Sequence, residues 1–163
     1  MSKKQVPAES EEFQDPLQNY DPKVYSDPLE KALAEESVSE IQYRPVAVVT
    51  PDTPIHKAVE KMANLQIASL LVEEDGCLVG VFSDRDVLDK VALEYAQVKN
   101  NPVRDVMTKD PAFVYESDSS ASALCVMAVL GFRHVPVIDA KHKALGIISP
   151  QRVTAFLRKH SYD

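Results

Sequence analysis

The sequence predicts an α/β fold built from two copies of one β-α-β-β-α unit, preceded by an N-terminal extension. The first observation behind this prediction is self-similarity: "VSEIQ" (38–42) aligns with "VRDVM" (103–107), and Met62 aligns with Met127, 65 positions later. The second is that the hydrophobic period changes in the same order in both copies, from strand-like runs to helical spacing and back. Such units usually pack on each other, because one copy cannot bury its apolar face alone.

The first copy shows each element of the unit in turn. The apolar run "VAVVT" (46–50) predicts a short strand, and Thr53-Pro54 predicts the start of a helix that runs to residue 64, because proline favours the first helical position. The runs "ASLLV" and "CLVGVF" flank "EEDG" and predict a β-hairpin. A second helix follows, and its expected apolar stripe is Val87, Leu88, Val91 and Ala92.

The second copy repeats this order. Strands are expected at 112–115, 134–138 and 144–148, and helices at 119–130 and 150–159. The polar stretch "EYAQVKNNP" (94–102) is the expected linker between the copies. The predicted domains are therefore 28–101, the first repeat with its lead-in helix, and 102–163, the second repeat.

Residues 1–27 are expected to form a disordered or loosely docked acidic arm. Residues 1–43 carry ten acidic side chains against four lysines, a balance of −6 out of the formal net charge of −7. A segment with so few apolar residues buries too little surface to offset the entropy of ordering. The rest of the chain is nearly neutral and offers no basic stripe for the phosphates of a duplex, so nucleic-acid binding is not expected.

Composition also argues against several other classes of protein. No apolar run is long enough to span a membrane and no apolar stretch follows the first lysines, so a cytoplasmic protein without a membrane partner is expected. Cys77 and Cys125 lack close spacing and are expected to be buried free thiols. The histidines lack the spacing of metal ligands, and the four glycines cannot build a phosphate-binding loop, so neither a metal site nor an enzyme is expected.

The predicted helix at 121–130, "ASALCVMAVL", is apolar nearly all round. Its counterpart in the first copy is amphipathic, with Lys57, Glu60, Lys61 and Asn64 on the polar face. A helix without a polar face is buried on several sides, which a single small domain hardly provides. We therefore expect residues 121–130 to form a homodimer interface, since two-fold dimers are the commonest oligomers. A helix sunk entirely in its own core is the alternative.

The phrase "SDRD" (83–86) has two interpretations. Ser83 and Asp86 have the spacing of a capping box, in which each side chain bonds the other residue's backbone N–H. The second copy has "SPQR", with Ser149 in the capping position and Arg152 in place of the acid. Because that helix is expected to begin without an acid, capping accounts for both serines but poorly for Asp86. Asp86 is therefore the best candidate for a ligand contact.

Several motifs together resemble a pair of cystathionine β-synthase (CBS) domains in tandem, called a Bateman module. They are the Gly-containing strand that ends in Ser-x-x-Asp and the phrases "VRDVMTKDP" and "FRHVPVID", and the resemblance covers residues 38 to about 158. It implies two CBS repeats packed through their sheets with pseudo-two-fold symmetry, usually as a dimer. It also implies up to two clefts between the repeats that bind adenosine-containing ligands.

Carried over by position, the resemblance places the ribose-binding acid on Asp86, with Ser83 beside the phosphate or ribose and Arg85 within reach of a phosphate. The opposite wall of this cleft comes from the other repeat, where Arg133 and His134 would add positive charge near the phosphates. The predicted ligand-binding residues are Val81, Ser83, Arg85, Asp86, Thr108, Ala112, Phe132, Arg133 and His134.

The second cleft departs from the family pattern. Arg152 replaces the acid, and Ala68 and Ser69 stand where the first cleft has Arg133 and His134. One competent site per chain is therefore expected, and contact of Arg152 with a phosphate is the weaker alternative.

The resemblance favours a non-enzymatic regulatory module that senses an adenosine-containing ligand: AMP, ADP, ATP or S-adenosylmethionine. The adenine nucleotide would be a regulatory ligand and no cofactor is implied. The signal would pass to an effector protein that the sequence does not identify. A structural or protein-interaction module with empty clefts is the first alternative, and an enzyme such as a nucleotide hydrolase is the second.

Overall fold

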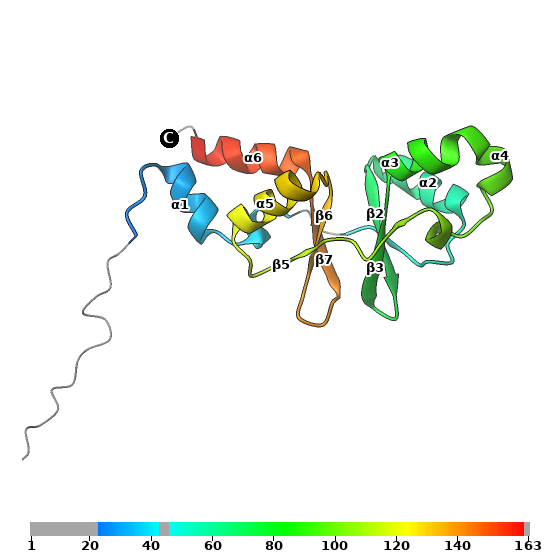
Figure 1. The fold of residues 1–163 in the computed structure, drawn as a ribbon, viewed down its shortest axis with the longest axis horizontal. Coiled ribbons are helices and arrows are strands. Elements are labelled where there is room, and N and C mark those ends of the chain that lie inside the picture. The colour runs from blue at the N-terminus through cyan, green and yellow to red at the C-terminus, as the bar shows by residue number, and fades with distance from the viewer. Residues whose placement is uncertain (1–22, 43–45, 162–163) are drawn as a thin grey trace, which may run out of the picture.

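The computed structural model describes residues 23–42 and 46–161 and has the predicted α/β architecture (Figure 1). Most of the predicted arm, residues 1–22, lies outside this range. Helix α1 (Pro28–Glu35) and a 3-10 turn (Val38–Glu40) come first. The first repeat contains β1 (Val48–Val49), α2 (Ile55–Leu65), β2 (Ser69–Glu74), β3 (Cys77–Ser83) and helical turns from Asp84 to Val98. After a 3-10 turn (Val103–Asp105) and β4 (Thr108–Lys109), the second contains β5 (Val114–Tyr115), α5 (Ser120–Leu130), β6 (Val135–Ile138), β7 (Ala144–Ile148) and α6 (Pro150–Ser161).

Each repeat forms its own small sheet. In both sheets the first short strand runs parallel to the next strand, β1 beside β2 and β5 beside β6, because a helix connects the two. The hairpins β2–β3 and β6–β7 are antiparallel, and β4 adds an antiparallel edge to β3. Figure 1 shows the hairpins side by side, with α2, α3 (Asp84–Asp86) and α4 (Tyr95–Val98) on one repeat and α1, α5 and α6 on the other.

The two repeats pack on each other through their sheets. A small apolar cluster between the sheets contains Leu71 and Val81 from the first repeat and Ala144 and Ile147 from the second. At the hairpin ends, the Leu78 N–H donates to the His142 carbonyl at 2.9 Å. Each repeat also has a larger core between its sheet and its helices. The predicted packing of two β-α-β-β-α units through their sheets is therefore confirmed.

Two lead-in segments, one before each repeat, are exchanged: the segment before the first repeat packs in the core of the second, and the segment before the second repeat packs in the core of the first. Val38 is fully buried in the core of the second repeat, and its N–H donates to the Asp118 carbonyl at 2.8 Å. Val103, its equivalent 65 positions later, is fully buried in the core of the first repeat, and its N–H donates to the Thr53 carbonyl at 2.8 Å. Packing therefore crosses the boundary expected between residues 101 and 102, although that boundary in sequence order stays a prediction.

Helix α1 follows the same exchange. It precedes the first repeat in the sequence but packs against α5 and α6 of the second, with Ala32 buried among them. The Asp27 side chain caps this helix by accepting from the Glu30 N–H at 2.8 Å. The lead-in helix therefore completes the core of the second repeat.

The predicted second helix of the first repeat is irregular. After α3 the chain forms a π-helical turn (Val87–Val91) and a 3-10 turn (Ala92–Glu94) before α4. The π turn changes which side chains face the core, because each residue in it advances less around the axis. Val91 is buried, but Leu88 is 68% exposed and Ala92 is also exposed, so the expected four-residue apolar stripe is wrong at these two positions.

Two expectations about single side chains also change. Cys77 and Cys125 are free, as expected, but both are exposed rather than buried. Lys61, expected on the polar face of α2, is partly buried because its ammonium group donates to the Val48 carbonyl at 2.7 Å.

No helix in the described part of the chain is both long enough and apolar enough to cross a membrane.

Candidate functional site

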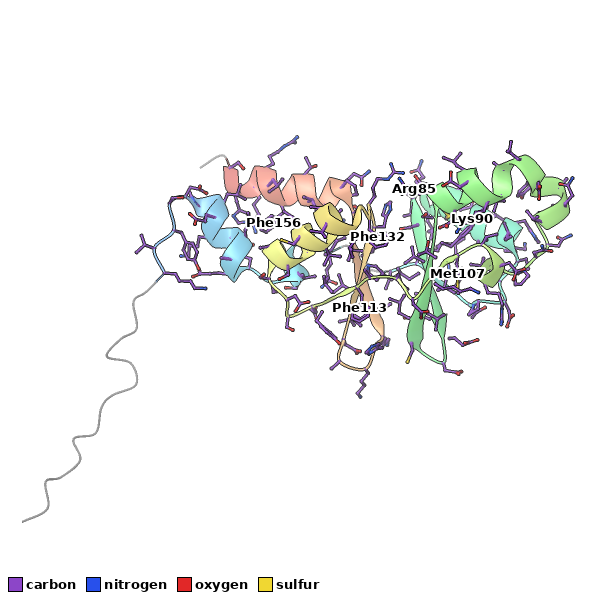
Figure 2. All side chains as sticks on the ribbon, viewed as in Figure 1. Arg85, Lys90, Met107, Phe113, Phe132 and Phe156 are labelled. Atoms are coloured by element: carbon purple, nitrogen blue, oxygen red, sulfur yellow. The ribbon has the colours of Figure 1, made fainter. Side chains whose placement is uncertain are left out.

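All nine predicted ligand-binding residues line one cleft, together with Asp84 and Pro111. The end of β3, the turn that follows it and Thr108 of the neighbouring β4 line one side, and Pro111, Ala112 and residues 132–134, just before β6, line the other. Arg85 and Phe132 come from different repeats (Figure 2). The cleft has a volume of about 130 Å³. Because its lining comes from both repeats, a ligand in it would contact both.

Asp86 is the most buried charged group of this cleft, with only 4% of its surface exposed. Its Oδ2 accepts hydrogen bonds from the Ser83 N–H and the Ser83 hydroxyl, both at 2.9 Å. The Asp86 N–H donates to the Ser83 Oγ at 3.4 Å, which completes a capping box. The structure therefore corrects the interpretation that capping accounts poorly for Asp86.

Lys90 holds the other oxygen of this carboxylate. Its ammonium group lies 2.7 Å from Asp86 Oδ1 and donates to the Val106 carbonyl, also at 2.7 Å. Lys90 thereby neutralises the buried carboxylate and ties the helical turn to the segment before β4. Lys90 was not predicted from the sequence, although a lysine four residues after an acid in a helix is a recognisable pairing signal.

The occupied positions on Asp86 determine how it could receive a sugar diol. A carboxylate offers about four lone-pair positions. Ser83 uses two of them and Lys90 uses one, so two sugar hydroxyls require one of these contacts to move. The Ser83 hydroxyl can turn away most easily, because its rotation leaves the Ser83 N–H and the Lys90 contact in place. Asp86 can therefore cap its helix and still accept a diol.

The charges around the first cleft nearly cancel. Asp84 and Asp86 carry negative charge, whereas Arg85 and Arg133 carry positive charge. Burial lowers the pKa of the half-buried His134 below its ordinary value; Asp84 opposes this shift and Arg133 adds to it. This shift favours the neutral form of His134 and so reduces the positive charge expected from it.

Asp84 and Pro111 are the two lining residues that the sequence analysis missed. Both adjoin residues that were named, Pro111 beside Ala112 and Asp84 between Ser83 and Arg85. The repeat offers no signal for Asp84, because its equivalent in the second copy is Pro150. Within the described residues, no group of three or more histidine, cysteine or acidic side chains could hold a metal ion.

A second cleft also lies between the repeats, with a volume of about 620 Å³. Arg152, Ala68 and Ser69 line it, as their positions in the repeat predict. His134 lines both clefts and so separates them. The expectation of one competent site per chain stays a prediction.

Comparison with known protein families divides the chain into the same two repeats. The CBS domain family matches twice, over residues 38–93 and 103–159. The CBS domain-containing protein CBSCBSPB1 of Arabidopsis thaliana is 32% identical over 113 residues, which are 69% of this chain and 21% of the plant protein. An uncharacterized 17.7 kDa protein of Acidianus ambivalens is 34% identical over 113 residues, 69% of this chain and 67% of that protein. The chain thus spans about a fifth of the plant relative's length.

Solved structures agree in fold. The structure of CBSX2, a CBS-pair protein from Arabidopsis thaliana, in complex with AMP has 28% identity and a TM-score of 0.65, covering 76% of this chain and 96% of that one. The CBS-domain containing protein ATU1752 from Agrobacterium tumefaciens has 29% identity and a TM-score of 0.66, covering 73% and 97%. With two matched repeats and the same fold, the chain belongs to the CBS domain family and is a tandem CBS pair.

Proposed function

We propose that the chain is a non-enzymatic, cytoplasmic regulatory module whose first cleft binds an adenosine-containing ligand. The observation that carries this proposal is the convergence of nine predicted residues from both repeats around the buried carboxylate of Asp86. The AMP complex of CBSX2, 28% identical, supports the ligand class. A cleft lined by both arginines and a buried acid suits a molecule with an anionic end and a hydroxylated sugar.

Each part of the ligand has a matching group in the cleft. The ribose hydroxyls donate to Asp86, with Ser83 giving up one contact as described above. Arg85 and Arg133 approach the phosphates from opposite repeats, and guanidinium groups match phosphate geometry well. The adenine lies against the chain from Thr108 to Ala112, where backbone groups read its edge.

Because the two walls belong to different repeats, a bound ligand bridges them. Binding then favours whichever relative position of the repeats places both walls on the ligand, and the response is limited by the ligand's difference in affinity between the two states. An effector protein would read that change. A structural module with empty clefts would show no such response.

The function is tested by thermal unfolding and calorimetry with AMP, ADP, ATP and S-adenosylmethionine. At least one of these ligands is expected to raise the melting temperature and to bind with saturable heat, because a ligand that binds only the folded state stabilises it. If none of the four does so, the sensing function is wrong and the structural alternative stands.

The lowered pKa of His134 leads to a pH prediction. A bound phosphate next to the ring favours its protonated form, so binding of an adenine nucleotide takes up a proton as the pH falls through the lowered pKa of His134. Affinity for the nucleotide is expected to rise as the pH falls to and below the ordinary histidine pKa of 6.5, more in the wild type than in His134→Gln. Calorimetry of both proteins measures this, and the difference between them removes the titration of the phosphate itself. Parallel pH profiles would contradict the prediction.

We also propose that the module forms a homodimer through α5. Within the described chain only Ser120 and Ala123 of this helix are buried, so the alternative of a helix sunk in its own core is wrong. Val129 and Leu130 are 81% and 52% exposed, and Cys125 and Ala128 beside them are also exposed. An apolar surface of this kind on one helix is typical of a protein interface.

The dimer is tested by Val129→Glu. This change places a charge on the exposed face of α5, so sedimentation is expected to show a dimer for the wild type at micromolar concentration and a monomer for the variant. Thr154→Glu, an exposed position on α6, is the control and should remain dimeric. A monomeric wild type would end the proposal.

A further inference from the structure

Part of the second cleft is lined by apolar side chains that keep access to solvent. Leu65 is 52% exposed, and Ile67 and Ile147 are half-buried. Val46 and Ala47 extend the same apolar rim. The cleft has a volume of about 620 Å³, which is large enough for an aromatic side chain together with its neighbours in a peptide. The apolar rim therefore suits an aromatic ring.

The charged side chains that line this cleft have one sign. Lys61 and Arg152 are cationic, and no acidic side chain is among the described lining residues. The Lys61 ammonium group donates to the Val48 carbonyl at 2.7 Å, which uses one of its three N–H donors. Arg152 already takes part in an interaction within the chain, so Lys61 is the better candidate for contact with an anionic group. A concave surface of one sign attracts groups of the opposite sign.

The N-terminal arm contains a segment of complementary composition. Residues 9–15, "ESEEFQD", contain no basic side chain and place one aromatic residue among four carboxylates: Phe13 with Glu9, Glu11, Glu12 and Asp15. An aromatic ring is a typical anchor in the apolar centre of a protein interface, and charges around it select a surface of opposite sign. The segment therefore matches both the apolar rim and the positive charge of the second cleft.

The arm is long enough to bring this segment to the cleft of its own chain. Helix α6 extends from the two sheets to α1 (Figure 1), and its His160 Nε2 lies 3.3 Å from Glu36 Oε2 at the end of α1. The path from Pro28 along α1 and back along α6 to Arg152 is about 35 Å, at 1.5 Å per helical residue with one pair of side chains between the helices. Phe13 precedes Pro28 by 15 residues, which span up to about 50 Å. Phe13 therefore reaches the cleft with slack to follow the surface.

Other surfaces of the described chain match the segment less well. Asp84 and Asp86 line the first cleft and would repel its carboxylates. The exposed face of α5 is apolar, but this helix has no charged side chain and would leave the acids without a partner. Of these three surfaces, the second cleft alone combines an apolar rim with positive charge.

We propose that residues 9–15 dock in the second cleft of their own chain, with Phe13 against the apolar rim and the flanking carboxylates beside Lys61. Because the lining comes from both repeats, the docked segment contacts both and keeps other molecules out of this cleft. The tether holds the segment at an effective concentration on the order of millimolar, so an intrinsic Kd of about 0.1 mM leaves about nine-tenths of the chains docked. The two clefts share only His134 among their described lining residues, so docking does not require a ligand in the first.

Tryptophan fluorescence of the full chain tests this proposal, because the sequence contains no tryptophan and Phe13→Trp adds a single reporter. At low ionic strength and without nucleotide, the indole is expected to emit at shorter wavelength than in Gln5→Trp and to be shielded from acrylamide. A tenfold loss of affinity in Lys61→Glu, added to Phe13→Trp, would raise the undocked fraction about fivefold, from about a tenth to about a half. Salt at about 1 M should also expose the indole, because it screens the charges.

Lys57→Glu is the matched control for Lys61→Glu. It makes the same change of charge at an exposed position of α2 that does not line the cleft, so the indole should stay shielded. Glu11→Lys combined with Glu12→Lys reverses the charge of the arm instead and should release the indole as Lys61→Glu does. Because this pair of changes leaves the cleft intact, a folding defect of the Lys61→Glu chain would not hide the result.

The proposal is overturned if the indole of Phe13→Trp is exposed, or if it stays shielded in both Lys61→Glu and the doubly reversed arm. Shielding that grows with protein concentration would place the segment on another copy of the chain. Loss of shielding in Val129→Glu but not in Lys61→Glu would place it on α5, and either result overturns docking in the chain's own second cleft. No nucleotide is present in these measurements, so their failure is distinct from a failure of ligand binding at the first cleft.

Discussion

Asp86→Ala is expected to weaken binding of the adenosine-containing ligand at the first cleft by about 10- to 100-fold. The reason is that a hydrogen bond to a charged acceptor contributes about 1.5–3 kcal/mol, and Asp86 is the buried one of the two acids that line the cleft. The measurement is calorimetry with whichever nucleotide raises the melting temperature most. The same substitution removes the capping box and the Lys90 pair, so the free energy of unfolding should also fall, by about 1–2 kcal/mol.

Two controls separate the loss of affinity from the loss of stability. Asp89→Ala removes a carboxylate from an exposed position of the same helical segment and should change neither quantity appreciably. Asp86→Asn keeps an oxygen that can accept from Ser83 and should retain part of the stability, while affinity still falls. If Asp86→Ala binds the nucleotide as tightly as the wild type does, Asp86 is a helix cap and the assignment of the first cleft is wrong.

Ile41→Ala is expected to lower the free energy of unfolding by about 2–5 kcal/mol, because it leaves a cavity in a packed core. Ile41 is 1% exposed and belongs to the core of the second repeat, together with Val38 and Val135. The loss of stability should therefore be largest in the second repeat, far along the sequence from residue 41. Amide hydrogen exchange is expected to increase in α5, β6 and β7 before it increases in α2 and β2.

Val106→Ala is the matched control, because Val106 is the equivalent residue 65 positions later and packs on the core of the first repeat. Its effect should be smaller, since Val106 is only partly buried, and exchange should rise first in α2 and β2. Both variants test whether each lead-in segment stabilises the repeat that it packs in rather than the repeat that it precedes in the sequence. Faster exchange in the first repeat after Ile41→Ala would show that the segment stabilises the repeat that follows it in sequence.

The order of elements could be predicted from the sequence because periodicity and the internal repeat are local properties. The strands β1 to β3 and β5 to β7 and the helices α2, α5 and α6 lie where the periodicity of apolar residues indicates them, whereas the short edge strand β4 was not expected. The irregular helix after Asp86 could not be predicted, because a π turn changes the set of buried side chains without a change in composition. Leu88 is the clearest example of this failure.

The candidate site could also be predicted in large part, because the repeat itself supplied an internal comparison. Asp86 was singled out by the contrast with Arg152, and the opposite wall came from the family resemblance. Lys90 was missed although its spacing from Asp86 is a recognisable signal, and Lys61 was expected only on a polar helix face. Their contacts with the Val106 and Val48 carbonyls are not revealed by local patterns. Backbone carbonyls become partners only when the chain is folded.

The sequence by itself determined the two β-α-β-β-α units, the candidacy of Asp86 as a ligand contact and the contrast between the two copies, because each of these follows from the spacing or the type of residues. Only the tertiary structure decided which repeat each lead-in segment completes, that Asp86 both caps its helix and lines a cleft, and that the cleft with Arg152 is the larger one. These features depend on how the repeats pack against each other. That packing is set by many small apolar contacts between distant residues such as Leu71 and Ala144, and no single motif encodes them.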